Sequence, residues 1–343
     1  MRQSTGHKKS HKVRNSILIV LGVLLLLIVL ALLWYALKIS KIQYDTGNGE
    51  WSIDTEISIP DEGETIFQDS DIPVVDDGQP IEVPDGDVWK DENVFNILLL
   101  GTDERSKEFS TNARADSILV LSLNKKEKTI KLVSLGRATG VPIPGRNDDL
   151  LTHTFRYGGA ELTMKTVQDC FKVDVEKYIR VNFHTFEQLI DSVGGVDIAL
   201  VKKEADALNQ LTSAGLTEGE NHLTGAVALQ YCRLRSIDSD WQRVERQRKT
   251  LQAAAHKAKT LNLLELSGAL DDILPLVKTN LTKGEITSLL LSAPGYLGKD
   301  FEQMTIPVKG SYWYKIGVDG REMNGIDFPQ NIRILREFLY GAE

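Results

Sequence analysis

The feature that most constrains this chain is an apolar run from Ile17 to Leu37 that contains no charged residue. As a helix, its 21 residues would span about 31 Å, enough to cross a hydrocarbon core of about 30 Å. Basic residues without acids precede the run, and Trp34 and Tyr35 lie near its end. A cleaved signal peptide would have a shorter apolar part ending at small residues. We therefore expect a permanent transmembrane helix over residues 16–38, a cytoplasmic tail at 1–15 and an extracytoplasmic remainder.

The segment after this run is strongly acidic. Residues 43–93 contain sixteen Asp and Glu against Lys90 alone, with four scattered prolines. That composition favours an extended or disordered spacer, so we assign residues 39–93 to a linker. Residues 94–343 have no net charge, whereas a general nucleic-acid binder would need a basic domain. The short tail before the span is also too small for a DNA-binding domain, so we do not expect nucleic acid as a partner.

The remaining residues predict an α/β fold with a mixed central β-sheet flanked by helices. Val94–Gly101 is a largely apolar run ended by glycine, which is typical of a strand buried on both faces. Strands are expected at 94–101, 117–123, 130–135, 177–183, 196–200 and 304–308, and helices at 160–170, 185–193, 205–216, onward from 239, within 261–291 and at 332–339.

Acids and arginines stand at the ends of the first three strands. Asp103 follows the first strand, Arg114 and Asp116 lead into the second, and Arg137 follows the third. Ligands of open α/β sheets bind at such strand ends. Two carboxylates suit Mg²⁺, which leaves its other positions to water and substrate phosphate. A pair of structural Arg–Asp bridges at the sheet rim fits the same pattern.

The densest charge array is Tyr231–Gln247, YCRLRSIDSDWQRVERQ. Arg233 and Arg235 alternate with apolar residues, as in a half-buried strand, and Ser239 is typical of the N-cap of a following helix. Asp240, Arg243 and Gln247 would share one stripe of that helix. Converging arginines favour an anionic, phosphorylated ligand, whereas a solvated charged face is the alternative.

The remaining polar candidates are weaker. Cys170 and Cys232 are too few for a disulfide framework; one bridge or two buried thiols would fit. His153 has the chemistry of an acid or base, but an isolated histidine is more often a satisfied structural donor, which is the interpretation we adopt. No spacing in the sequence is typical of zinc ligands.

Six motifs resemble the LytR-CpsA-Psr family in content and order. They are GTDER, RADSILVLSLN, SLGRATGVPIPG, YGGAELT, VNFHTFEQLIDSVGGVDI and YCRLRSIDSDWQRVERQRK. The resemblance covers residues 94–262, which we assign to the catalytic domain, and leaves 263–343 as a C-terminal extension packed on it. It implies a Mg²⁺-dependent (or Mn²⁺-dependent) enzyme at the cell membrane. Such an enzyme moves a teichoic acid or capsular polysaccharide from a polyprenyl-pyrophosphate carrier to peptidoglycan.

The resemblance also implies roles for individual residues. Asp103 and Asp116 would hold the metal, and the carrier's prenyl tail would enter a pocket between apolar strands and helices. The pyrophosphate would be bound by Arg114, Arg137, Arg233, Arg235, Arg243 and Gln247. Arg137, Asp240 and Arg243 would be catalytic, with Asp240 taking the proton of an acceptor sugar hydroxyl.

This sequence departs from the family pattern at several positions. Family members usually read Arg-Asp-Thr where this chain has Arg137-Ala138-Thr139, and they tend to have Lys and Asn at Leu150 and Thr152 and Gly at Gln242. A carboxylate beside the phosphate-binding arginine is therefore missing. Besides an active transferase, the sequence thus allows a catalytically weak or inactive polyprenyl-phosphate-binding regulator of envelope synthesis.

Overall fold

The computed structural model describes residues 36–45, 66, 71–104, 108–110, 113–234, 237, 240–296 and 299–341. The chain divides into one unit over 1–42 and a second over 43–343. The predicted transmembrane helix lies outside the described residues except for 36–38. No helix of the described ranges combines the length and apolarity that a membrane crossing requires.

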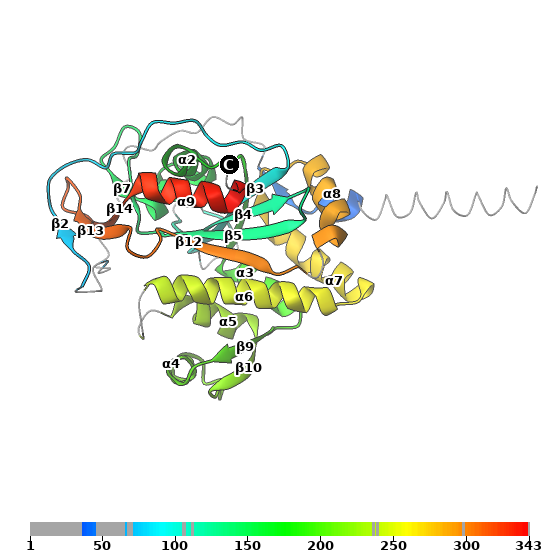
Figure 1. Ribbon diagram of the computed structural model, residues 1–343. Helices are drawn as coiled ribbons and strands as arrows, with labels where there is room; N and C mark the ends of the chain where they lie inside the picture. The colour runs from blue at the N-terminus through cyan, green and yellow to red at the C-terminus, as the bar shows by residue number, and fades with distance from the viewer. Residues whose placement is uncertain are drawn as a thin grey trace, which may run out of the picture. The chain divides into compact units, whose positions relative to one another are not determined.

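A seven-stranded mixed sheet forms the centre of the second unit, as predicted (Figure 1). Its strands, in spatial order, are β1 (Gln43–Tyr44), β11 (Lys278–Thr279), β8 (Lys177–Asn182), β3 (Val94–Thr102), β4 (Ala115–Asn124), β5 (Thr129–Leu135) and β12 (Phe301–Ile306). β3 pairs parallel with β8 and antiparallel with β4, and β5 pairs antiparallel with β4. The parallel partner on the other side of β5 is β12, so residues beyond 262 complete the central sheet.

Strand alternation divides the sheet into two unlike faces. On β3, Leu98 and Leu100 are fully buried in the main core, together with Val120 of β4 and Val133 of β5. Leu99 points to the opposite face because successive side chains of a strand alternate. One face therefore packs into the main core, while Leu99 and Leu119 on the other face line a cavity.

Helices cover both faces (Figure 1). α2 (Leu151–Phe171) and α9 (Phe328–Tyr340) pack on the core face, and α3 (Phe183–Ser192), α5 (Gly225–Arg233) and α6 (Asp240–Thr260) lie on the other. α2 begins earlier than predicted because two helical segments join across Gly158 and Gly159. Gly159 has a φ of 66°, a conformation that glycine adopts without steric cost, so the Gly-Gly pair bends the helix rather than starting it.

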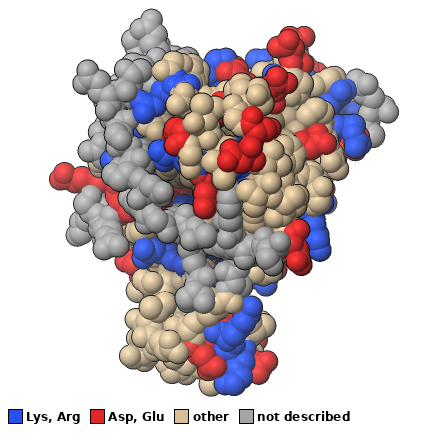
Figure 2. Space-filling model, turned by 90° about the vertical axis from the view of Figure 1, so that its left-hand side faces the viewer, with Lys and Arg blue, Asp and Glu red and all other residues tan. Residues whose placement is uncertain are grey.

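A smaller lobe extends from α5. It contains β9 (Val196–Leu200), α4 (Lys202–Thr212) and β10 (Gly219–Leu223), which pairs antiparallel with β9. A second apolar cluster joins this lobe to α3, α5 and α6. Figure 2 shows lysine, arginine and acidic side chains close together at the end of the molecule where this lobe lies.

The C-terminal region combines helices with strands. α7 (Leu263–Ile273) and the short 3-10 helix η1 (Leu274–Leu276) precede β11, and α8 (Lys283–Ser292) and the 3-10 helix η2 (Ala293–Tyr296) follow it. β13 (Tyr312–Ile316) and β14 (Glu322–Ile326) form a hairpin. This hairpin was not predicted from the sequence. It is joined by β2 (Val74–Val75), which pairs parallel with β13.

The second half of the acidic segment is therefore ordered against the domain rather than a free spacer. Besides β2, the backbone N–H of Trp89 donates to the carbonyl of Lys172 at 3.0 Å. The guanidinium of Arg336 lies over the Trp89 ring, 3.1 Å from its centroid. These contacts use backbone groups and a single aromatic side chain, which an acidic composition does not indicate.

Candidate active site

The predicted strand-end residues meet because β3 and β4 are antiparallel neighbours. The end of β3 therefore lies beside the start of β4, with Thr102 opposite Ala115 and Gly101 opposite Ser117. Asp116 is the extra residue of a β-bulge at this point. A bulge re-aims a side chain, which explains how the consecutive residues Asp116 and Ser117 both line one cavity.

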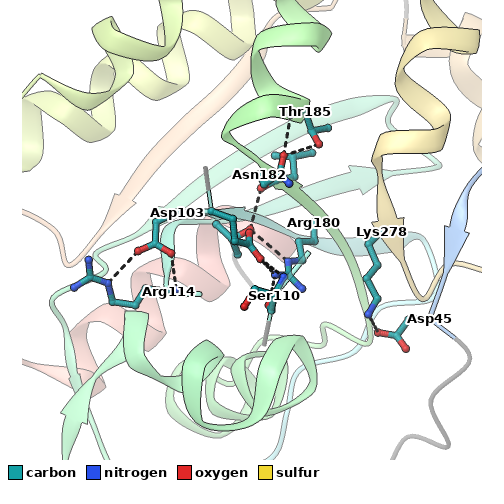
Figure 3. A network of polar contacts seen from close by, with 11 residues as sticks. Asp45, Asp103, Ser110, Arg114, Arg180, Asn182, Thr185 and Lys278 are labelled. Atoms are coloured by element: carbon teal, nitrogen blue, oxygen red, sulfur yellow. Dashed lines mark hydrogen bonds and ion pairs between the residues drawn. The ribbon is translucent and has the colours of Figure 1, made fainter. Parts of the chain in front are cut away.

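Each acid has an arginine partner. Asp103 accepts hydrogen bonds from the backbone N–H of Arg114 at 2.8 Å and from its Nε at 3.2 Å (Figure 3). Asp116 Oδ1 accepts from Arg137 Nη1 at 2.9 Å. The Arg137 side chain is only 9% exposed, so this pair is largely shielded from water. The Arg–Asp bridges of the structural interpretation are thus present, and both acids also line the cavity.

The helical face of the site comes from α5 and α6. Arg233 ends α5, with its guanidinium 4.5 Å from the centroid of the Phe183 ring. Arg243 and Gln247 stand one turn apart on α6 and line the same cavity. Gln247 accepts a hydrogen bond from Ser117 Oγ at 3.1 Å, which fixes α6 against β4.

The strand predicted around Tyr231 is wrong, because these residues end helix α5. Ala228, Tyr231 and Cys232 are all buried, which is the spacing of one helical face. The predicted alternation extended over too few residues to distinguish the two periods. Arg235 and Ser239 lie outside the described residues, and so does the side chain of Asp240, although Asp240 begins α6.

A cavity of about 590 Å³ joins these groups. Its polar end contains Asp103, Arg114, Asp116, Arg233, Arg243 and Gln247. Its apolar wall contains Leu99, Leu119, Ile179, Val181, Phe183, Phe186, Leu189, Leu229 and Leu251, contributed by β3, β4, β8, α3, α5 and α6. The cavity therefore suits a ligand with a charged head and a hydrocarbon part.

A buried network beside Asp103 was not predicted. Glu104 accepts from Thr102 Oγ1, from Arg180 Nη2 and from the backbone N–H of Ser110. Arg180 also donates to the carbonyl of Ser110 (Figure 3). Arg180 lies between the rings of Phe109 and Phe155, 4.6 Å from each centroid. This network holds the chain on the carboxyl side of Asp103. Sequence patterns could not reveal it because Arg180 and Glu104 are far apart in the chain.

His153 belongs to a separate cluster and does not line the cavity. Its Nδ1 lies 2.8 Å from Asp149 Oδ1, and Tyr157 donates to Asp149 Oδ2 at 2.6 Å. Arg321 is a further ion-pair partner of Asp149. His153 is 4% exposed, so the structural interpretation of this histidine holds. Burial, followed by the neighbouring Asp149, raises the pKa of Tyr157 to about 12, and its hydroxyl remains a donor at neutral pH.

This cluster predicts an acid-sensitive contribution to stability. Burial raises the pKa of Asp149, but hydrogen bonds and charge from His153, Tyr157 and Arg321 lower it more, to below its ordinary value of 3.8. A depressed carboxyl pKa stabilises the fold above the unfolded-state pKa, and this contribution disappears as pH falls. The free energy of unfolding should therefore decline between about pH 5 and pH 3 more steeply than in Asp149→Asn. Urea titrations can test this, with exposed Asp206→Asn as the variant that keeps the wild-type slope.

Cys170 and Cys232 are free and buried, and therefore unbridged. Cys170 lies in the main core, whereas Cys232 also lines the cavity and donates from Sγ to Thr250 Oγ1 at 3.3 Å. Burial is the main cause that raises the pKa of each thiol to about 12. Both are therefore unreactive at neutral pH.

The carboxylates fit a divalent cation shared with a substrate. No group of three or more His, Cys, Asp or Glu side chains in the described part of the chain could form an all-protein metal site. Asp103 and Asp116 instead supply two oxygen donors to one cavity. Mg²⁺ characteristically takes one or two protein carboxylates together with substrate phosphates and water. The donor set is therefore compatible with Mg²⁺, and the adjacent arginines would complement the phosphates.

Comparisons with known proteins give a consistent result. A model of the LytR_cpsA_psr family matches residues 67–330. A polyisoprenyl-teichoic acid–peptidoglycan teichoic acid transferase, TagU of Oceanobacillus iheyensis, is 32% identical over 70% of this chain and 76% of its own. TagT of Bacillus subtilis, with the same transferase name, is 36% identical over 54% of this chain and 59% of its own.

Solved structures give the same picture. TagT bound to LIIa-WTA superposes with a TM-score of 0.59 and 29% identity, covering 72% of this chain and 90% of that one. The crystal structure of B. subtilis TagT has a TM-score of 0.57 and 27% identity over 78% and 98% of the two chains. The matched region thus extends beyond the predicted limits of 94–262 at both ends.

Proposed function

This chain belongs to the LytR_cpsA_psr family, whose model covers residues 67–330, and from this membership we propose that it is a membrane-anchored extracytoplasmic phosphotransferase. It transfers a glycopolymer of the teichoic acid or capsular polysaccharide type from a polyprenyl-pyrophosphate carrier to peptidoglycan. The observation that best supports this proposal is one cavity that has both an end lined by arginines and acids and an apolar wall. A lipid-linked pyrophosphate has the same division between a charged head and a hydrocarbon tail.

The proposed reaction is a substitution at phosphorus. A hydroxyl of the peptidoglycan acceptor attacks the phosphorus that carries the glycopolymer, and the bond from this phosphorus to the polyprenyl phosphate breaks. The acceptor proton passes to a base, for which we propose Asp240, and polyprenyl phosphate leaves. Catalysis of this kind consists mainly of positioning and charge stabilisation.

The residues around the cavity supply both. Arg114, Arg233 and Arg243 present planar donor forks to the phosphate oxygens, and Arg235 is proposed to join them. Arg137 does not line the cavity itself. It acts indirectly, through its ion pair with Asp116, which does line the cavity. Asp103 and Asp116 would hold Mg²⁺ or Mn²⁺, which when bound neutralises charge on the pyrophosphate.

The direct test uses the purified full chain with a lipid-linked glycopolymer, Mg²⁺ and peptidoglycan. A covalent product should form, and it should be lost in Arg137→Ala. Mass spectrometry of lipid that copurifies with the chain tests carrier binding independently. Absence of transfer despite intact carrier binding would contradict the enzyme proposal.

A second function, carrier binding with weak or no turnover, is favoured by one observation. Ala138 does not place a polar group beside Arg137; it packs with Leu150 and Met323 in a small apolar cluster, against Ile66 and Ile81. The two positions where the family usually has Asp and Lys are therefore both apolar here and contact the same cluster. This cluster contributes no carboxylate beside Arg137.

Restoring the family residue distinguishes the two functions. If the natural chain is a weak enzyme, Ala138→Asp should increase the transfer rate several-fold while copurified lipid stays unchanged. Ala138→Asn, similar in size but uncharged, is the matched control, because it makes the same intrusion into the apolar cluster. An equal rate in the natural chain and the Asp variant would show that the missing carboxylate does not limit transfer.

A further inference from the structure

Helix α8 contains four large aliphatic residues but no buried one. Ile286 and Leu289 are partly exposed, Leu290 is 46% exposed and Leu291 is 79% exposed. Helices that are apolar on several sides are usually buried in a core or a membrane. The domain covers none of these side chains fully, so part of the apolar surface of α8 is left exposed by the rest of this unit.

Helix α7, which precedes β11 in the sequence, also exposes large apolar side chains. Leu264 is 85% exposed and Leu266 is 38% exposed. Leu264 and Leu291 are the two most exposed large apolar side chains in the described part of the molecule. Figure 1 shows α7 and α8 at the same side of the sheet. Such gatherings of exposed apolar residues mark interaction surfaces.

The chain itself indicates what this surface meets. β1 pairs with β11, and its Gln43 donates from Nε2 to the carbonyl of Pro275 in η1. Lys283 at the start of α8 lies over the Tyr44 ring. β1 therefore sits where α7 ends and α8 begins. It also begins six residues after the apolar run ends at Leu37, and six residues span at most about 20 Å.

We propose that the exposed leucines of α7 and α8 form a membrane-docking surface that inserts into the outer leaflet. The proposal rests on the membrane anchoring in the proposed function. A bilayer is favoured as the occupant because the tether requires this edge of the domain to remain near the membrane. Apolar helical side chains can lie about 5–10 Å deep in the headgroup and acyl boundary.

Docking would also serve the cavity. α7 packs against α3, and α3 contributes Phe183, Phe186 and Leu189 to the cavity wall. The docked surface would thus hold the apolar wall close to the bilayer in which the carrier's prenyl chain resides. A tether alone would leave the domain free to turn, so the surface adds orientation to anchoring.

Lipid quenching of site-specific labels tests the proposal. The full chain is reconstituted in phosphatidylglycerol and phosphatidylethanolamine vesicles after Leu264→Cys or Leu291→Cys and labelling with an environment-sensitive fluorophore. Cys170 and Cys232 are buried and should label weakly, which the unsubstituted chain controls. Leu211→Cys is the matched control, because Leu211 is a leucine that is 60% exposed on the distant helix α4.

Lipids brominated on their acyl chains should quench the labels at 264 and 291 several-fold more than the label at 211. Equal quenching at the three positions would overturn the proposal. So would labels at 264 and 291 that are shielded from water without lipid quenching, because a second copy or another protein would then cover the helices. If the chain did not float with vesicles, that result would contradict both the membrane anchor and this inference.

A functional arm separates this inference from the proposed activity. Leu264→Glu with Leu291→Glu should raise the apparent KM for vesicle-embedded carrier several-fold and leave thermal unfolding unchanged, whereas Leu211→Glu should alter neither. No transfer by any form, with quenching intact, would contradict the proposed function alone. Normal transfer by the double variant, without differential quenching, would contradict docking alone.

Discussion

Arg243→Ala is expected to lower the transfer rate constant about 10²–10³-fold, the usual effect of removing one preorganised donor from a site of developing charge. Arg243 is 2% exposed, lines the polar end of the cavity and lies in the first turn of helix α6. Its position is therefore fixed before the substrate arrives. Arg243→Lys should recover only part of the rate, because an ammonium lacks the planar fork that matches phosphate oxygens.

The measurement is single-turnover transfer with saturating acceptor, made alongside quantification of copurified carrier. Lys249→Ala is the matched control: Lys249 is a cation on the same helix, but it is exposed, pairs with Glu245 and does not line this cavity. It should retain the natural rate. An Arg243→Ala chain that folds normally and keeps more than about a tenth of the rate would contradict the assigned role of this residue.

The sequence predicted the polar end of the site better than its apolar wall. Asp103, Arg114, Asp116 and Arg137 stand at strand ends, where position alone limits what a side chain can face. Leu99 gave no comparable signal, because Leu98 and Leu100 beside it are equally apolar. A strand buried in a core and a strand lining a cavity look the same in composition. The two kinds of strand are distinguished only in the structure, where Leu98 lies in the main core and Leu99 lines the cavity.

Contacts between distant segments account for most of the remaining differences. β12 pairs with β5 across more than 150 residues, and β2 pairs with β13 across a longer separation. Nothing local in either strand specifies its partner. The departure at Ala138 was visible in the sequence, whereas its packing against Leu150 and Met323 required the fold. A family pattern thus identifies which group is missing, and the structure shows what replaces it.

The largest stability effect is expected at the buried pair of Glu104 and Arg180. Their side chains are 5% and 7% exposed, and Glu104 also accepts from Thr102 and Ser110. Glu104→Gln leaves the Arg180 charge buried without its counter-ion, which typically costs about 3–5 kcal/mol of unfolding free energy. Glu104→Leu combined with Arg180→Met should cost less than either single change, because neither charge then remains unpaired.

Urea denaturation of the full chain gives both values. Glu337→Gln is the control, because its pair with Arg333 is 50–64% exposed and should contribute less than about 1 kcal/mol. Asp103 precedes Glu104 directly, so Glu104→Gln should also lower transfer under conditions in which the chain remains folded. If the double variant were as destabilised as the worse single variant, the loss would come from packing around Phe109 and Phe155. The ion pair would then not be what holds the chain beside Asp103 in place.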